Sequence, residues 1–352
     1  MSTAADKFCN DGASKSNYND GVCEMTSMLH SMSTITEGNN NNSDNTNNTC
    51  ANCGKEGNSN DMNTCNRCKS VKYCNAACKK KHRSKHKKKC DRRVAELHDE
   101  QLFKQPLHDE EDCPICFMRI PTLTSGSKYN TCCGKMICSG CIHAPVYDNE
   151  GNKMEQTCPF CRTPTSSSGE ETVERLKKRV EVGDANAINS IGSYYDVGSH
   201  GLPLDHTKAL EFYHRAGELG NAVSYYNIGR AYGTGDGVKM DTKKATHYYE
   251  LAAMGGCAHA RYNLGCDEAN EGNMDRAVKH WMISVSSGDP DSLENIRRMF
   301  LNGYATKDDY ANALRSHQAY LDAIKSDQRD EAAAAREDYK YIENYYYTKK
   351  DV

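Results

Sequence analysis

The 352-residue chain lacks any apolar run long enough to cross a bilayer, which takes about 20 mostly apolar residues. Its first residues, MSTAADKFCNDG, lack the basic start and apolar centre of a secretory signal peptide. The formal net charge is only −3, so bulk charge favours neither nucleic acid nor a membrane surface as a partner. These absences predict a soluble protein of a reducing compartment, either cytoplasmic or nuclear.

Cysteine, in contrast, is abundant, with 19 residues. In a reducing compartment so many cysteines are not expected to form a disulfide framework. Fifteen of them fall between Cys50 and Cys161, mostly as C-x2-C or C-x3-C pairs. Zinc coordination is the natural explanation of such pairs, so this part of the chain is predicted to hold zinc modules.

The chain after residue 172 has a different composition and an internal repeat. Gly192, Gly229 and Gly265 recur at intervals of 37 and 36 residues, and the pair Lys208-Ala209 returns as Lys244-Ala245. Periods of this length predict a solenoid of helix pairs, in which each unit buries its apolar face against its neighbours. Two further copies, one shortened and one degenerate, follow the clearest two.

These patterns predict a mainly α protein with small zinc-stabilised modules. Residues 1–49, which include NNNNSDNTNNT, hold too little apolar material to fold and are predicted to be disordered. The expected order is a disordered Asn-rich tail (1–49), a zinc finger (50–90), a helical linker (91–110), a second zinc finger (111–164), a linker (165–172), helical repeats (173–326) and a C-terminal capping helix (327–352).

The first cysteine cluster offers eight ligands, the number that two tetrahedral zinc sites need. They form four pairs: Cys50-x2-Cys53, Cys65-x2-Cys68, Cys74-x3-Cys78 and His86-x3-Cys90. His82, one helical turn before His86, is an alternative ligand. With so little apolar material in the segment, metal binding would supply most of its folding free energy.

With Tyr73 before its fifth ligand, this cluster resembles a MYND zinc finger. The resemblance implies interleaved pairs, with one zinc on Cys50, Cys53, Cys74 and Cys78 and the other on Cys65, Cys68, His86 and Cys90. Arg83 stands where the family usually has tryptophan, near the surface that docks proline-rich peptides, so the resemblance does not extend to that activity.

The run KKKHRSKHKKKC, residues 79–90, makes this finger locally very basic. A solvated helix face is the favoured interpretation, and a nuclear-import or nucleic-acid patch is the alternative. No aromatic residues are interleaved to stack on bases, so nucleic acid is not expected as a partner.

The second cluster contains Cys113-x2-Cys116, the adjacent Cys132 and Cys133, Cys138-x2-Cys141 and Cys158-x2-Cys161. Both members of the adjacent pair are needed to reach eight ligands. Lys135 cannot replace either, because a protonated ammonium has no lone pair to donate. We therefore expect Cys132 to complete the set, with His143 as the competing ligand.

The motifs CPIC, CGKMIC-x2-C and CPFCR over residues 111–164 resemble a RING finger. The resemblance implies one zinc on Cys113, Cys116, Cys138 and Cys141 and another on Cys132, Cys133, Cys158 and Cys161. It also implies a ubiquitin ligase without a covalent catalytic residue, which positions a ubiquitin-conjugating enzyme and its ubiquitin for transfer. Ile115, Pro159 and Arg162 match the positions that contact the conjugating enzyme and ubiquitin in this family.

The pattern G-x-x-Y-x-x-G-x-G-V-x-x-D-x-x-K-A, from Gly229 to Ala245, resembles Sel-1-like repeats. This resemblance, over about residues 180–290, implies a surface for docking a protein client. Taken together, the sequence predicts four zinc ions, two per finger, and favours a RING-type ubiquitin ligase whose repeats recruit the substrate. The alternative is a non-enzymatic scaffold in which fingers and repeats only bind proteins.

Overall fold

The computed structural model describes residues 48–58, 61–104, 112–122, 126–144 and 157–342. The Asn-rich tail expected over residues 1–49 lies almost wholly outside these residues. The chain divides into two compact units, one of which ends at Lys104, while the other contains Gln105–Val352. In the described part of the chain, none of the helices combines the length and apolarity that crossing a bilayer requires.

In its described residues, the first unit contains one very short hairpin and one long helix. Strands β1 (Asn63–Thr64) and β2 (Lys72–Tyr73) pair antiparallel. Helix α2 (Ala76–Leu102) begins after Asn75, whose side chain accepts a hydrogen bond from the Cys78 amide. Because α2 runs on without a break past residue 90, the helical segment expected over 91–110 is, as far as Leu102, a continuation of the finger's own helix; residues 105–110 lie outside the described chain.

The core of this unit is built mainly from cysteines. Cys50, Cys65, Cys68 and Cys90 are buried together with Tyr73. A core so poor in large aliphatic side chains buries little apolar area, so the hydrophobic effect contributes little to its stability. This composition agrees with a module that folds around metal.

The second unit begins with another small finger. Strands β3 (Ser127–Asn130) and β4 (Lys135–Cys138) form an antiparallel hairpin in which Tyr129 lies opposite Met136. Helix α3 (Ser139–His143) follows β4 directly. Ile137 is fully buried among the cysteines of this finger. We call residues 112–164 the second finger, and residues 48–90 the first finger.

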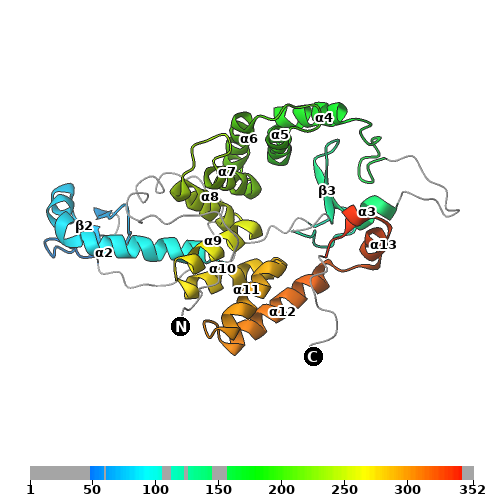
Figure 1. The fold of residues 1–352 in the computed structure, drawn as a ribbon. Coiled ribbons are helices and arrows are strands. Elements are labelled where there is room, and N and C mark those ends of the chain that lie inside the picture. Colours follow the sequence, from blue (N-terminus) through cyan, green and yellow to red (C-terminus); the bar gives the residue numbers. More distant parts are fainter. Residues whose placement is uncertain (1–47, 59–60, 105–111, 123–125, 145–156, 343–352) are drawn as a thin grey trace. The chain divides into compact units, whose positions relative to one another are not determined.

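Helices then follow one another without strands as far as the described chain extends, and Figure 1 shows them stacked in succession. Each helix from α4 to α12 packs on the next, as expected for a solenoid. Their bounds are α4 Gly169–Glu181, α5 Ala185–Val197, α6 His206–Glu218, α7 Ala222–Thr234, α8 Thr242–Met254, α9 Ala258–Asn270, α10 Met274–Ser286, α11 Pro290–Leu301 and α12 Lys307–Ile324. The predicted mainly α class with small cysteine-rich modules is confirmed.

The recurring glycines mark where an aromatic ring of the following helix lies against the backbone. A Cβ on Gly192 would lie 2.8 Å from Tyr213, and one on Gly229 would lie 2.7 Å from Tyr249. On Gly265 it would lie 2.4 Å from Trp281, which is fully buried. Real Cβ atoms do not approach other atoms this closely, so each repeat needs glycine for the two helices of its pair to meet.

The chain ends in a short helix, α13 (Asp327–Ala335), and a 3-10 turn, η4 (Glu337–Tyr339). Of the capping helix expected over 327–352, the described chain has α-helix only over Asp327–Ala335, and residues 343–352 lie outside the described residues. Helix α13 packs against α3 of the second finger. The last helix of the chain thus contacts an element almost 190 residues earlier.

Candidate metal centres and the surface of the second finger

Sixteen candidate ligands converge in four groups of four. Within each group the potential ligand atoms all lie within 4.8 Å of one another. In the first finger the groups are Cys50, Cys53, Cys74, Cys78 and Cys65, Cys68, His86, Cys90. In the second finger they are Cys113, Cys116, Cys138, Cys141 and Cys132, Cys133, Cys158, Cys161. These are the interleaved sets that the two family resemblances implied.

Four of the cysteine pairs share one backbone turn. After the C-x2-C pairs that begin at Cys50, Cys65, Cys113 and Cys158, the amide of the next residue donates to the carbonyl of the pair's first cysteine, with N···O distances of 2.8–3.0 Å. That next residue has a positive φ in every case: Gly54 (71°), Lys69 (54°), Phe117 (55°) and Arg162 (60°). Three of these are not glycine, and a side chain in this region costs free energy. Such strain persists only where the surrounding contacts impose the turn, as a bound metal would.

The thiols in each group are too crowded to ionise independently. A hydrogen bond from the Cys138 thiol lowers the pKa of Cys113 to about 4, and the same bond raises the pKa of Cys138. In the first finger, the Cys74 amide lowers the pKa of Cys50 to about 6. Hydrogen bonding to Cys78 raises the pKa of Cys74 to about 12. A divalent cation would remove this conflict, because it binds every cysteine of a group as a thiolate.

Fifteen sulfur donors and one imidazole in four-ligand groups fit zinc. Zinc prefers tetrahedral thiolate and imidazole sites, and closed sites of this kind are structural. Bound there, zinc would supply folding free energy and no chemistry. The protein's own contribution is to hold the four turns and the helix residues at the required spacing.

The second finger places Cys132 with Cys133, Cys158 and Cys161; the Cys161 and Cys132 sulfurs are 3.3 Å apart. His143 belongs to none of the four groups and instead meets the ring of Tyr339 edge-on, with centroids 6.1 Å apart. Lys135 is exposed on β4. This geometry favours Cys132 over His143 as the completing ligand.

We expect metal analysis of the purified chain to give four zinc ions, and Cys132→Ser to lower the value toward three. The loss follows because a hydroxyl is a far weaker zinc ligand than a thiolate. His143→Ala, the matched control, should leave the value at four. A value near three in the wild type that Cys132→Ser does not change would contradict the assignment.

His82, the alternative ligand in the first finger, lies beside the group and outside it. Its ring stacks on His86 with centroids 5.7 Å apart, and its Nδ1 lies 3.2 Å from the Tyr73 hydroxyl. His86 Nε2 lies 3.3 Å from the sulfur of Cys68. His82 and Tyr73 therefore hold the His86 ring in place, as residues around metal ligands commonly do.

The predicted partner-contact residues lie on the turns of the second finger. Ile115, within Cys113-x2-Cys116, is 36% exposed. Pro159, within Cys158-x2-Cys161, is half-buried, and Arg162, directly after that pair, is exposed. Two residues that the sequence analysis did not select, Phe117 (78% exposed) and Phe160 (46%), lie on the same turns. Their sequence positions could have indicated them, because each is a large apolar residue inside or directly after a C-x2-C pair.

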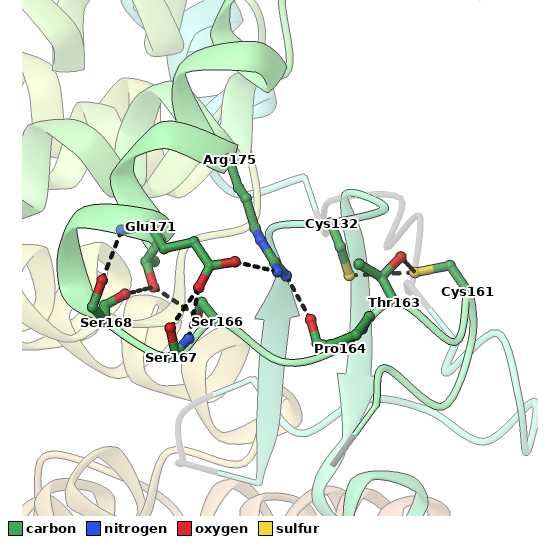
Figure 2. Close-up of polar contacts among 10 residues, drawn as sticks. Cys132, Cys161, Thr163, Pro164, Ser166, Ser167, Ser168, Glu171 and Arg175 are labelled. Carbon is green, nitrogen blue, oxygen red and sulfur yellow. Dashed lines mark hydrogen bonds and ion pairs between the residues drawn. The ribbon is translucent and has the colours of Figure 1, made fainter. Parts of the chain in front are cut away.

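The last turn of the second finger is tied to the first solenoid helix. Figure 2 shows Arg175 of α4 reaching back to the Pro164 carbonyl at 2.8 Å and also bonding Glu171 at 2.6 Å. Glu171 accepts from both the amide and the hydroxyl of Ser167. The side chain of Ser168 caps α4. The segment predicted as a linker over 165–172 is thus short and is hydrogen-bonded to α4.

A second contact joins the β3–β4 hairpin to the start of the repeats. The Tyr129 hydroxyl donates to Asp184 at 2.7 Å, and Arg179 donates to the same oxygen at 2.8 Å. Burial alone would raise the pKa of Asp184, but these two bonds outweigh it and hold that pKa below its usual value. Asp184 also caps α5. One carboxylate therefore anchors the finger, α4 and α5 together.

A third contact joins the finger to the last helices. Arg329 of α13 is fully buried and donates to the carbonyls of Arg119 (2.8 Å), Met118 (3.4 Å) and Ile324 (2.6 Å). The Thr122 hydroxyl donates to the carbonyl of residue 287 at 2.6 Å. The second finger is therefore bonded to both the first and the last helices of the repeat array.

Comparisons with known proteins agree with two of the three modules. The MYND finger model matches residues 50–90, and the Sel1 repeat model matches residues 185–221 and 222–257. The chain is thus a modular protein that carries a MYND finger and Sel1 repeats. Both were predicted from the sequence, and both are confirmed.

Two curated relatives from Arabidopsis thaliana match short parts of the chain. E3 ubiquitin-protein ligase DA2 is 40% identical over 57 residues, 16% of this chain. ERAD-associated E3 ubiquitin-protein ligase component HRD3A is 30% identical over 96 residues, 27% of this chain. The chain spans only 13% of the length of each of these curated relatives.

Among solved structures, a Sel1 repeat protein from Oxalobacter formigenes is 26% identical, with a TM-score of 0.41. The match covers 46% of this chain and 67% of that one. A protective antigen of uropathogenic Escherichia coli strains is also 26% identical, with a TM-score of 0.37, over 46% of this chain and 35% of that one.

Proposed function

We propose that the chain is a RING-type ubiquitin ligase, in which the second finger recruits a ubiquitin-conjugating enzyme and the Sel1 repeats recruit a protein substrate. The observation that carries this proposal is the exposure of large apolar side chains on the first and last C-x2-C turns of the second finger. Ile115, Phe117 and Phe160 are exposed there beside Arg162. Such a surface has no role in the finger's own core and is suited to an apolar partner.

The attachment of this finger to the repeats supports the same proposal. A ligase of this class contributes positioning, since it holds the thioester-linked ubiquitin close to the acceptor. Positioning requires a fixed geometry between the finger and the substrate-binding module. The bonds through Tyr129, Thr122 and Arg329 supply that connection. Arg162 would contribute its rigid fork of donors at the junction of conjugating enzyme and ubiquitin.

The test is discharge of ubiquitin from a panel of charged conjugating enzymes by the zinc-loaded full chain. The full chain is needed because the second finger is bonded to helices outside it. We expect stimulated discharge, reduced about 10-fold or more by Ile115→Ala and by Arg162→Ala, the size of effect that central contact residues have. Exposed residues of the repeats supply matched controls, Val182→Ala and Arg297→Ala, which should retain activity.

A non-enzymatic adaptor is the second candidate. Repeats of this kind are protein-binding modules, and the relative HRD3A is by name a component of a ligase. Zinc-loaded protein that stimulates discharge from none of the conjugating enzymes would favour this candidate. Capture of a partner by the repeats would then become the function to measure.

A further inference from the structure

The exposed lysines of helix α2 form a surface that neither zinc binding nor the proposed ligase activity uses. Residues 79–90 contain seven lysines and one arginine but no acidic residue. His86 and Cys90 turn inward to their ligand group, whereas Lys80, Lys81, Lys85, Lys87, Lys88 and Lys89 are all exposed. We call these six the lysine face.

In the part of the first unit that the structure describes, the lysine face is not paired with acidic residues. In the described part of the first unit, the ion pairs of α2 all lie beyond Cys90. They join Arg92 and Arg93 to Glu96 and Glu100, Asp91 to Arg67, and His98 to Asp99. Among the ion pairs in the described part of the first unit, none includes a lysine of the face. Six like charges on neighbouring turns repel one another, and only a partner with closely spaced negative charges would offset that cost.

The arrangement of the charges points to the shape of the partner. Successive helix residues turn by about 100°, so the lysines wrap around the helix on three sides. Lys80 and Lys87 lie on one flank, Lys81 and Lys88 on the outer side, and Lys85 and Lys89 on the other flank. A flat anionic membrane would meet only one of these sides. The exposed residues of 79–90 also include no large apolar side chain that could insert into lipid.

We propose that the lysine face of α2 binds the phosphate backbone of double-stranded DNA. The major groove of B-form DNA is about 12 Å wide and admits an α-helix, with phosphates along both of its edges. The major groove of duplex RNA is too narrow, and no aromatic residue is available for stacking on single strands. The lack of aromatic residues therefore argues against base stacking, but it does not argue against contacts between lysines and phosphates.

The binding would not depend on base sequence. Lysine ammonium groups act as point charges on phosphates, and contacts to phosphate carry little sequence information. Such binding weakens steeply with salt, because each neutralised phosphate releases counterions. For six contacts, the association constant should fall about 10³-fold between 50 and 200 mM salt.

The experiment is fluorescence anisotropy of the zinc-loaded full chain with a labelled DNA duplex, over a series of salt concentrations. The variant Lys81→Gln/Lys85→Gln/Lys88→Gln removes three charges from the face and should reduce the log–log salt slope by about 2.7. Lys177→Gln/Lys178→Gln/Lys243→Gln removes the same charge from exposed lysines of the repeats and should leave the slope unchanged. Unchanged zinc content and helical circular dichroism would show that the first variant still folds.

Several results would overturn the proposal. One is the absence of DNA binding at 50 mM salt, and another is an equal slope in wild type and the α2 variant. Equal affinity for duplex RNA would contradict the groove argument. Lysine-dependent binding to vesicles containing anionic lipid, without binding to DNA, would assign the face to a membrane instead. None of these results depends on ubiquitin discharge, so the proposal fails or stands separately from the ligase function.

Discussion

Chelating the metal should unfold both fingers and leave the core of the repeat array intact. Structural zinc contributes on the order of 10 kcal/mol to modules of this size, and the cysteine-rich core of the first finger has little else to hold it. Helix α2 should lose its zinc-binding half, because His86 and Cys90 are its buried anchors there. The fifteen clustered cysteines should become reactive toward a thiol reagent in the same step.

The chain contains an intrinsic fluorescent probe for the expectation that the repeat core stays intact after chelation. Trp281, the single tryptophan, is fully buried in a core formed by helices α9 to α12. Its fluorescence should keep the same emission maximum after chelation and shift to longer wavelength only on heating. A shift of Trp281 emission on chelation alone would contradict the independence of the repeat core from the metal.

The ligand groups could be predicted because their information is local. Spacing within each C-x2-C or C-x3-C pair identified the ligands, and the family resemblances supplied the interleaving that spacing alone leaves open. The repeat could be predicted equally well, because Gly192, Gly229 and Gly265 recur at nearly constant intervals. The structure adds the reason for them, which is that a ring of the partner helix occupies the place of a Cβ.

The remaining features had no local signal. Lys69, Phe117 and Arg162 adopt a positive φ that glycine or asparagine usually indicates, because their turns and not their own preferences impose it. Helix α2 is longer than the finger because nothing between residues 76 and 102 ends a helix; the expected boundary at residue 90 came from the last ligand.

Contacts between distant parts of the chain could not be predicted either, because they also leave no local signal in the sequence. The Tyr129–Asp184 bond joins residues 55 apart, and Arg329 lies in an alanine-rich stretch that reads as an ordinary exposed helix. Nothing in that stretch indicates a partner more than 200 residues earlier. Yet among the arginines that join the second finger to the helices, Arg329 is the most deeply buried, with none of its side chain accessible to solvent.

Replacing Arg329 with methionine should loosen the second finger. Methionine retains much of the apolar stem but leaves the carbonyls of Met118, Arg119 and Ile324 without their donor. A buried polar group that loses its partner costs about 1–3 kcal/mol, so we expect a total cost of about 3 kcal/mol. The chain at Met118 and Arg119 directly follows the first C-x2-C turn, so this cost should fall on the site of Cys113 and Cys138.

Zinc release to a chelator measures this effect within one finger. A cost of about 3 kcal/mol corresponds to release from the second finger on the order of 100-fold faster, if release requires local opening. Release from the first finger should be unchanged, because Arg329 belongs to the other compact unit of the chain. Arg315→Met, the same change at an exposed position of α12, is the matched control. Wild-type release kinetics in Arg329→Met would mean that the finger holds its metal without α13, and that its attachment to the last helices only orients it.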